Sequence, residues 1–335
     1  MMNKRLKQGS TFLLAVALTF PLLTLPGAKA ASAIDTDAEC SIEFDISGNS
    51  SELLNDDVTV KVNLYKVALV DESGNYTGTG AFSKLDLSSV SADNLDTAAA
   101  TWAERAAEAK KLLKDNTESP TTVTLTQGRG TATGLKTGLY LVDTPEVVTT
   151  NYTYTFTPYL VSLPTNNYYS NGNDDWIYDL TKEYNSAVGL KPEEHARYGD
   201  LKINKTLAHH NATTGKKATF VFKIEITPLK GKTETRIESL DFEAAGDSSV
   251  TITKIPAGAT VTVKEEYSGA SYKLTSANDQ NATIVATDRG AKVDPASVSF
   301  TNDINDNMNG GYGVKNNFKL DENGQYQYTE PAEKN

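Results

Sequence analysis

The segment LKINKTL, residues 201–207, decides the fold expected for the C-terminal part of this chain. Its apolar residues Leu201, Ile203 and Leu207 alternate with polar ones, which is typical of a β-strand with one face on a hydrophobic core. The remaining position on that inward face holds Lys205. An unpaired ammonium group is costly to bury. The pattern therefore predicts that this lysine meets partners inside the protein.

Two other strands place a polar residue on an apolar face. In VTVKEEY, residues 261–267, the inward face continues at Glu265, and in VSFTND, residues 298–303, it continues at Asn302. One such residue would indicate a strand end that reaches solvent. A lysine, a glutamate and an amide on the first, a middle and the last strand of one unit indicate that the three side chains meet.

Such a trio supports a specific reaction. Burial lowers the pKa of a lysine and raises that of a glutamate, because both charged forms lose hydration. Lys205 as a neutral amine would attack the side-chain amide of Asn302, while a protonated Glu265 polarises the carbonyl and carries the proton to the departing ammonia. The product is an internal isopeptide bond, formed once per chain, and we expect no enzyme acting on outside substrates. The alternative is a lysine that reaches solvent at a strand edge, with VKEEY as a solvated turn.

The chain is expected to be exported. A basic start, the apolar run TFLLAVALTFPLLTL and the small-residue end GAKA predict a signal peptide over residues 1–30, with cleavage after Ala30 or Ala33. The formal net charge is −11, which argues against nucleic acid and anionic membranes as partners. We expect no membrane insertion of the mature chain. The single cysteine, Cys40, excludes an internal disulfide and is either a buried residue of a first strand or an intermolecular link.

Strand patterns dominate both halves of the mature chain. We expect an all-β fold of two tandem immunoglobulin-like β-sandwich domains, at residues 40–181 and 200–305. A linker over 182–199 joins them, and a polar tail follows from 306 to 335. The Ala-rich segment DTAAATWAERAAEAKKLLKDN, residues 96–116, predicts one surface helix added to the first sandwich.

The second domain resembles the B-type domain of Gram-positive collagen adhesins and the related isopeptide-forming pilin domains. The matching motifs, in order, are LKINKTL, FVFKI at 220–224, IPAGATVTVKEEYSGASYKL at 255–274 and VSFTN at 298–302. The resemblance implies that Lys205 and Asn302 form the cross-link and that Glu265 is the assisting acid. Glu266 is the alternative acid if the strand parity is one residue out.

The first domain is similar, more loosely, to the N-terminal domain of Gram-positive shaft pilins, through VNLYKVA at 62–68, the strands TGLYLVDT and FTPYLVSLPT, and WIYDL at 176–180. That resemblance implies a lysine beside a proline that is joined to the next subunit. Here the nearest such pair is Lys191-Pro192, with Lys182 as a poorer candidate. Lys66 continues an apolar face, and Asp143 occupies a position suited to a second assisting acid, without an asparagine to complete the set.

These features predict a structural subunit of an extracellular, cell-surface pilus or fimbria, with other pilin subunits as partners, joined by a sortase. The alternative is an adhesin that binds a host matrix or glycan ligand through the first domain. We expect no cofactor and no metal site, because the three histidines lack carboxylates or cysteines at ligand spacing. The end QYTEPAEKN, residues 327–335, carries no LPxTG-like signal. Either the chain is truncated, or it accepts a bond without donating one, or its tail strand GVKNNFKL at 313–320 pairs with a neighbour.

Overall fold

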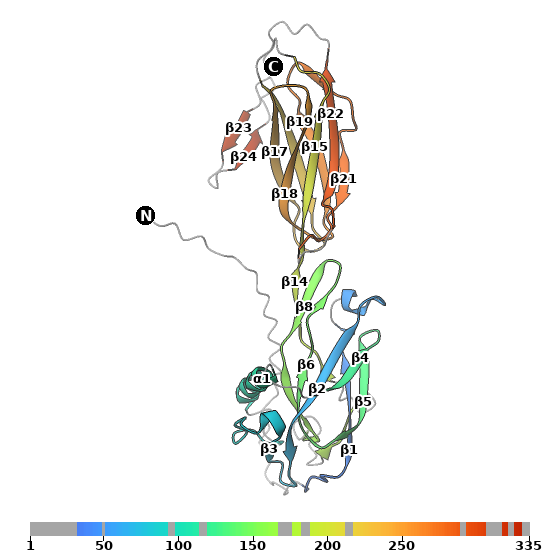
Figure 1. Ribbon diagram of the computed structural model, residues 1–335, viewed down its shortest axis with the longest axis vertical. Coiled ribbons are helices and arrows are strands. Elements are labelled where there is room, and N and C mark those ends of the chain that lie inside the picture. The colour runs from blue at the N-terminus through green and yellow to red at the C-terminus, as the bar shows by residue number, and fades with distance from the viewer. Residues whose placement is uncertain are drawn as a thin grey trace, which may run out of the picture.

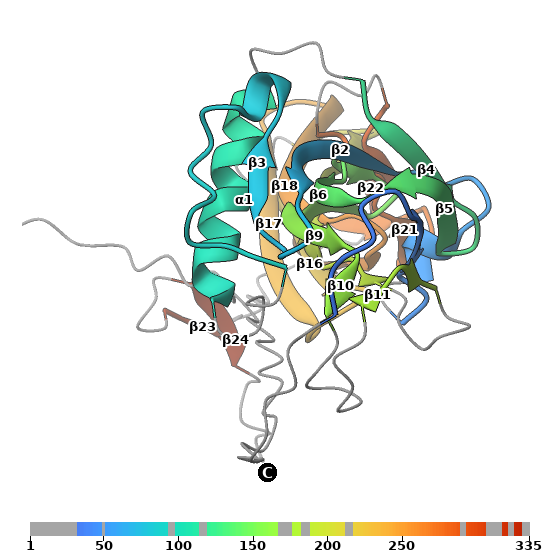
Figure 2. The same ribbon diagram turned by 90° about the horizontal axis from the view of Figure 1, so that it is seen from below.

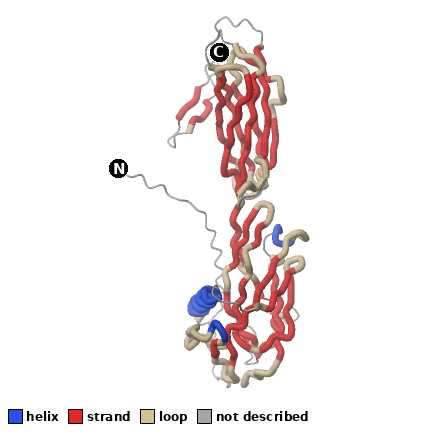
Figure 3. Tube along the Cα trace, viewed as in Figure 1, coloured by secondary structure: helices blue, strands red, loops and turns tan. Residues whose placement is uncertain are grey.

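The computed structural model describes residues 32–48, 51–92, 98–113, 119–166, 176–181, 188–211, 217–288, 293–305, 317–320 and 325–329. These residues form two β-sandwiches stacked end to end (Figure 1). Strands account for most of the described chain, with one long helix at the side of the N-terminal sandwich (Figure 3). The predicted all-β fold with one added helix is confirmed. The predicted signal peptide lies outside the described residues.

The N-terminal sandwich packs two sheets over a shared core. One sheet has the order β12-β1-β13, with β5 also paired to β1, and the other has the order β3-β2-β6-β9, with β4 also paired to β2. A smaller sheet, β14-β8-β7, extends toward the second sandwich (Figure 1). The strands are β1 Glu39–Asp45, β2 Val60–Val70, β3 Tyr76–Gly78, β4 Thr121–Leu125, β5 Arg129–Lys136, β6 Gly138–Asp143, β7 Val147–Val148, β8 Tyr152–Phe156, β9 Tyr159–Leu163, β10 Thr165–Asn166, β11 Trp176–Ile177, β12 Asp179–Leu180, β13 Val188–Gly189 and β14 Pro192–Ala196.

The helix α1, Ala99–Leu113, covers the outer face of the β3-β2-β6-β9 sheet. Figure 2 shows it along one side of the sandwich, beside β3. Its apolar positions Trp102, Ala106 and Ala109 are buried in a second core that also contains residues of β6 and β9. The sheet is therefore covered on both faces, and all six residues of β6 are buried. Two 3₁₀ turns, η1 Ser51–Leu54 and η2 Gly80–Phe82, complete this part.

The C-terminal sandwich contains two four-stranded sheets, with the orders β18-β15-β22-β20 and β17-β16-β19-β21. Its strands are β15 Tyr198–Leu207, β16 Ala218–Thr227, β17 Glu234–Phe242, β18 Gly246–Pro256, β19 Thr260–Tyr267, β20 Tyr272–Leu274, β21 Gln280–Thr283 and β22 Ala296–Ile304. Alternate residues of the long strands meet in a core between the two sheets. The first strand, β15, pairs in parallel with the last, β22. A separate hairpin of β23 Asn317–Leu320 and β24 Tyr326–Thr329 follows.

The segment expected as a linker differs from the prediction. Within residues 188–196, β13 pairs with β1, and β14 pairs along its whole length with β8. Short, polar edge strands carry no hydrophobic alternation, and Pro192 is tolerated because it is the first residue of its strand. Part of the expected tail strand also differs, because β23 is paired with β24. The last residues of the expected linker, from Tyr198, already belong to β15, and residues 182–187 and 313–316 lie outside the described ranges.

The two sandwiches meet at a joint centred on Arg197, between β14 and β15. Its guanidinium donates to the main-chain oxygens of Thr149 (2.7 Å) and Thr150 (3.3 Å) on one side and to Asp288 Oδ1 (2.8 and 3.0 Å) on the other. At Gly258, φ is 76° and a Cβ atom would lie 2.7 Å from Asn151 Oδ1 of the first sandwich. Both features require close approach of the two bodies, since only glycine combines that conformation with so little space.

Candidate functional site

The three polar residues that the sequence places on inward faces meet in the core of the C-terminal sandwich. Lys205 lies on β15, Asn302 on β22 and Glu265 on β19. Lys205 and Asn302 share one face of one sheet, where the parallel register pairs Leu207 with Asn302. Glu265 reaches across from the opposite sheet. The side chain of Lys205 is 0% exposed and that of Glu265 is 1% exposed, and Asn302 is fully buried.

Every member of the trio contacts the other two. The Nζ atom of Lys205 lies 3.1 Å from Glu265 Oε2 and donates a hydrogen bond to Asn302 Oδ1. The amide nitrogen of Asn302 donates to Glu265 Oε1 at 2.6 Å. The amine therefore faces the carbonyl of the amide, while the carboxyl faces both the amine and the amide nitrogen. This is the contact set required for attack by nitrogen and departure of ammonia.

Burial shifts the protonation of both titratable groups toward their neutral forms. Loss of hydration lowers the pKa of Lys205, and the nearby Glu265 opposes this effect only in part. Loss of hydration likewise raises the pKa of Glu265, against the opposing influence of Lys205 and of the hydrogen bond from Asn302. A neutral amine beside a protonated carboxyl is the state that nucleophilic attack on an amide needs. Glu265 Oε2 faces Nζ without a well-aligned hydrogen bond, which places it to take the proton that the amine loses once the carboxyl has given its own proton to the amide.

Aromatic side chains enclose the trio. The Nζ atom lies 4.4 Å from the centre of the Phe220 ring, and this ring packs against Phe242 and Tyr272 with centroids 5.6 Å apart in each case. On β16, Phe222 packs against Phe300 of β22. These rings exclude water and so cause the desolvation that favours the neutral pair. The alternating FVFKI strand marks both phenylalanines as core residues, but the contact of Phe220 with the lysine was not predicted.

The other residues singled out in the sequence lie outside this site. Glu266, the alternative acid, is exposed, whereas Glu265 is buried. Lys191 is exposed immediately before β14, and Lys182 lies outside the described residues. In the first sandwich, Asp143 is bonded to Lys110 of α1, an ion pair that no local sequence pattern indicated.

Lys66 and Cys40 lie in the interior of the first sandwich. Burial lowers the pKa of Lys66, which is partly buried. Cys40 is a free, buried thiol on β1, as one of the two interpretations predicted, and burial raises its pKa to about 11. Lys66 and Asp143 do not form a pair, because the carboxylate of Asp143 is bonded to Lys110 of α1.

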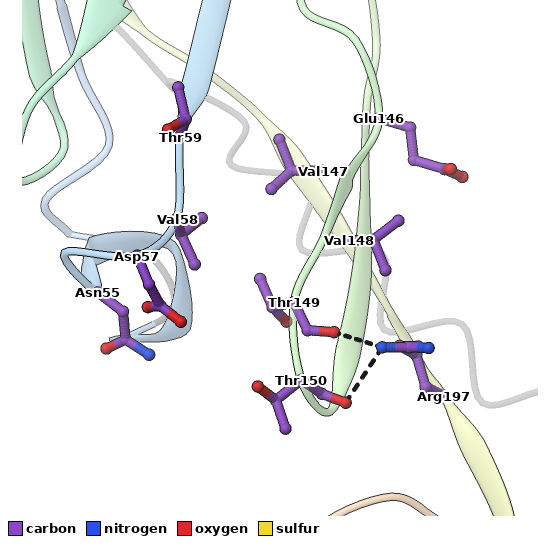
Figure 4. A pocket seen from close by; sticks show the side chains of 10 residues that line it. All are labelled: Asn55, Asp57, Val58, Thr59, Glu146, Val147, Val148, Thr149, Thr150 and Arg197. Atoms are coloured by element: carbon purple, nitrogen blue, oxygen red, sulfur yellow. Dashed lines mark hydrogen bonds between the residues drawn. The ribbon is translucent and has the colours of Figure 1, made fainter. Parts of the chain in front are cut away.

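An open polar cleft of about 430 Å³ adjoins the joint between the sandwiches. Figure 4 shows the segment from Asn55 to Thr59 on one side and the turn through Thr149 and Thr150 on the other, with Arg197 bonded to that turn. Within the described ranges, no group of three or more His, Cys, Asp or Glu side chains is placed to hold a metal ion. Among the helices described, none is long and apolar enough to cross a membrane.

Comparisons with known proteins give one family match and several structural similarities. A family model described as a domain of unknown function (DUF5979) matches residues 201–305, the part of the chain that contains the trio. A comparison with curated proteins finds no match.

Solved structures similar to this chain include pilins of Gram-positive bacteria. GBS52, the minor pilin of Streptococcus agalactiae, is 13% identical, with 83% of this chain and 99% of that chain covered and a TM-score of 0.24. The major pilin SpaA of Corynebacterium diphtheriae is 14% identical, with coverage of 73% and 69% and a TM-score of 0.27. The T6 backbone pilin of Streptococcus pyogenes is 11% identical, with coverage of 81% and 65% and a TM-score of 0.32. These values are low, so the functional assignment rests on the geometry of the site.

Proposed function

We propose that this chain is a structural subunit of a Gram-positive cell-surface pilus, and that its C-terminal sandwich is locked by an isopeptide bond between Lys205 and Asn302. The observation that carries the proposal is the fully buried contact of an amine, an amide and a carboxyl in an aromatic core. Buried charges without a function are rare because desolvation makes them costly.

The bond forms by condensation. The neutral Nζ of Lys205 attacks Cγ of Asn302, so that the Nζ–Cγ bond forms and the Cγ–Nδ2 bond breaks. Glu265, protonated at the start, gives its proton to Nδ2, which leaves as ammonia, and the resulting carboxylate takes one proton from Nζ. Because the three groups are held in contact, proximity supplies most of the acceleration. The carboxyl group ends in its starting state, so the reaction consumes only the lysine and the asparagine.

The position of the bond suits a subunit that carries tension. The chain enters the C-terminal sandwich through β15, and β22 is its last strand there. Because these strands are parallel neighbours, pulling on the two ends shears them past each other. A covalent link between them would carry that load in place of hydrogen bonds.

Intact mass of the purified mature protein tests the bond. Each Lys–Asn condensation releases one ammonia, about 17 Da by its composition. We expect the mass to be lower than that of the sequence by this amount, and Glu265→Gln to restore the full mass. An unmodified mass in the native chain would falsify the cross-link.

The second candidate function is that of an adhesin, favoured by the cleft beside the joint. Its lining combines hydroxyl, amide and carboxylate groups such as those of Asn55, Asp57 and Thr59, which suit a glycan. Denaturing gels of surface extracts separate the two functions. A ladder of covalent multimers that disappears with Lys191→Arg supports a pilus subunit joined at that lysine by a sortase. Monomer alone, with glycan binding that Asp57→Ala abolishes, supports the adhesin.

A further inference from the structure

We infer that the connection 275–280 acts as a bracket that holds the strands of Glu265 and Asn302 at reacting distance, with Asn278 and Gln280 as its positioning residues. This inference rests on the proposed isopeptide bond. The connection follows β20, which lies in the sheet of Asn302, and leads into β21, which lies in the sheet of Glu265. It therefore crosses between the two sheets whose spacing the reaction depends on.

On the side of the acid, the bracket binds the main chain of Glu265 itself. The regular pairing of β19 with β21 ends at Val263, which pairs with Gln280. The next inward residue would lack a strand partner for its N–H group, and this group donates instead to Asn278 Oδ1 at 2.9 Å. The pairing of β19 with β16 is also irregular here, with a register shift between Val221 and Phe222. Asn278 thus fixes Glu265 where the sheet alone holds it least.

On the side of the amide, the bracket binds β22 just before Asn302. The side-chain amide of Gln280 donates to the oxygen of Ser299 and accepts from its N–H group at 3.0 Å. Thr301 is held in the same way: its oxygen accepts from the N–H group (2.8 Å) and hydroxyl (2.9 Å) of Thr275, and its N–H group donates to Ser276 Oγ at 3.2 Å.

These bonds matter because the acid and the amide lie in different sheets. Two packed sheets are about 10 Å apart, and their spacing is set by core side chains that tolerate small shifts. The contact between Asn302 Nδ2 and Glu265 Oε1 is 2.6 Å, and a displacement of about 1 Å can slow a reaction on the order of 100-fold. The main chain of Gln280 pairs with β19, the strand of Glu265. Its side chain is hydrogen-bonded to Ser299 of β22, the strand of Asn302. This one residue therefore couples β19 to β22 directly.

The rate of bond formation tests the bracket. The full chain is made by cell-free synthesis, which is then stopped. Samples are quenched in denaturant at intervals, and their intact mass is measured to follow the loss of ammonia. Asn278→Leu and Gln280→Met remove the hydrogen bonds, and Asn278→Asp keeps the acceptor. Asn281→Leu is the matched control, because it removes a side-chain bond that joins β19 to β21 without reaching β22, from Thr262 Oγ1 to Asn281 Oδ1 at 2.7 Å, on the exposed face. Each rate is divided by the folded fraction measured on an unreactive Asn302→Ala background.

We expect Asn278→Leu and Gln280→Met to slow the loss of ammonia about 3- to 10-fold, the effect of one or two hydrogen bonds. Asn278→Asp and Asn281→Leu should stay within about 2-fold of the native rate, and the pH optimum should not move in the three variants that add no charge, Asn278→Leu, Gln280→Met and Asn281→Leu. The inference is overturned if Asn278→Leu and Gln280→Met react as fast as the control, or if Asn278→Asp is as slow as Asn278→Leu. A native chain that loses no ammonia contradicts the proposed function instead.

Discussion

Stretching a single molecule from its two ends distinguishes a cross-linked C-terminal sandwich from an uncross-linked one. In the native chain, the proposed bond between Lys205 and Asn302 would carry the load between two neighbouring strands, so the residues between them would not extend. Lys205→Met removes the amine and keeps a side chain of similar length and apolar character. The separation of the two residues is 97 positions. At 3.3–3.6 Å per extended residue, the variant should release about 320–350 Å that the native chain withholds.

The assay is force spectroscopy on the mature chain, with the N-terminal sandwich as an internal reference present in both traces. Lys202→Met is the matched control, because Lys202 lies on the same strand and points to the opposite, partly exposed face. It should leave the native trace unchanged. Glu265→Gln gives a second way to prevent the bond and should reproduce the extra release. A native chain that itself shows the release of about 320–350 Å would refute the load path.

Further predictions concern stability, protonation and assembly. Lys205→Met should lower the stability of the C-terminal sandwich by about 5 kcal/mol, by the loop-closure scale for cross-links, or roughly 20–40 °C in its calorimetric midpoint; equal midpoints would contradict this. Bond formation needs a neutral Lys205 amine and a protonated Glu265 carboxyl. The neutral amine is lost as the pH falls below the lowered pKa of Lys205. The protonated carboxyl is lost as the pH rises above the raised pKa of Glu265. The quenched-mass rate should therefore be bell-shaped in pH, and a rate that rises throughout would exclude Glu265 as the acid. Cys40, with a pKa of about 11, should react with an aromatic disulfide reagent at pH 8 only after unfolding. Arg197→Ala should loosen the joint and widen the distribution of distances in small-angle scattering, whereas an unchanged distribution would show that other contacts set the angle. Under the pilus function, Lys191→Arg should remove covalent multimers while the ammonia loss stays intact.

The sequence predicts the C-terminal sandwich well because packing there follows one rule. Each long strand has one face on a single core between two sheets, so alternation reports directly which side chains point inward. The strand motifs LKINKTL, FVFKI, VTVKEEY and VSFTN correspond to β15, β16, β19 and β22. The same parity places Lys205, Glu265 and Asn302 on inward faces. Their mutual contact follows because strands at the first, middle and last positions are neighbours within or across the two sheets.

The N-terminal sandwich was harder to predict because its central sheet is covered on both faces. Strand β6 is buried throughout, so alternation carries no information there. The pairing of β2 with β6 shifts register only after Lys66, so the alternation that puts Lys66 on the face of Val62 and Leu64 ends there, and the next two residues, Val67 and Ala68, are both buried. The bond from Lys110 to Asp143 depends on where α1 packs, and β13 and β14 depend on pairing with strands far away in the sequence. The bracket at 275–280 cannot be predicted from local sequence patterns either, because its hydrogen bonds join residues that are far apart in the sequence.

The count of buried hydrogen-bond donors explains why an apolar core accommodates a lysine. A charged Lys205 would present three N–H groups, but among the residues that the structure describes its nitrogen contacts only Glu265 Oε2, Asn302 Oδ1 and the face of Phe220. Together with the two N–H groups of the Asn302 amide, five donors would be buried in the reactants. The proposed product retains a single amide N–H group, because one proton of the charged amine passes to Glu265 and ammonia leaves with the other three. The arrangement that brings the reacting atoms together therefore also removes the polar groups that would make their burial unfavourable.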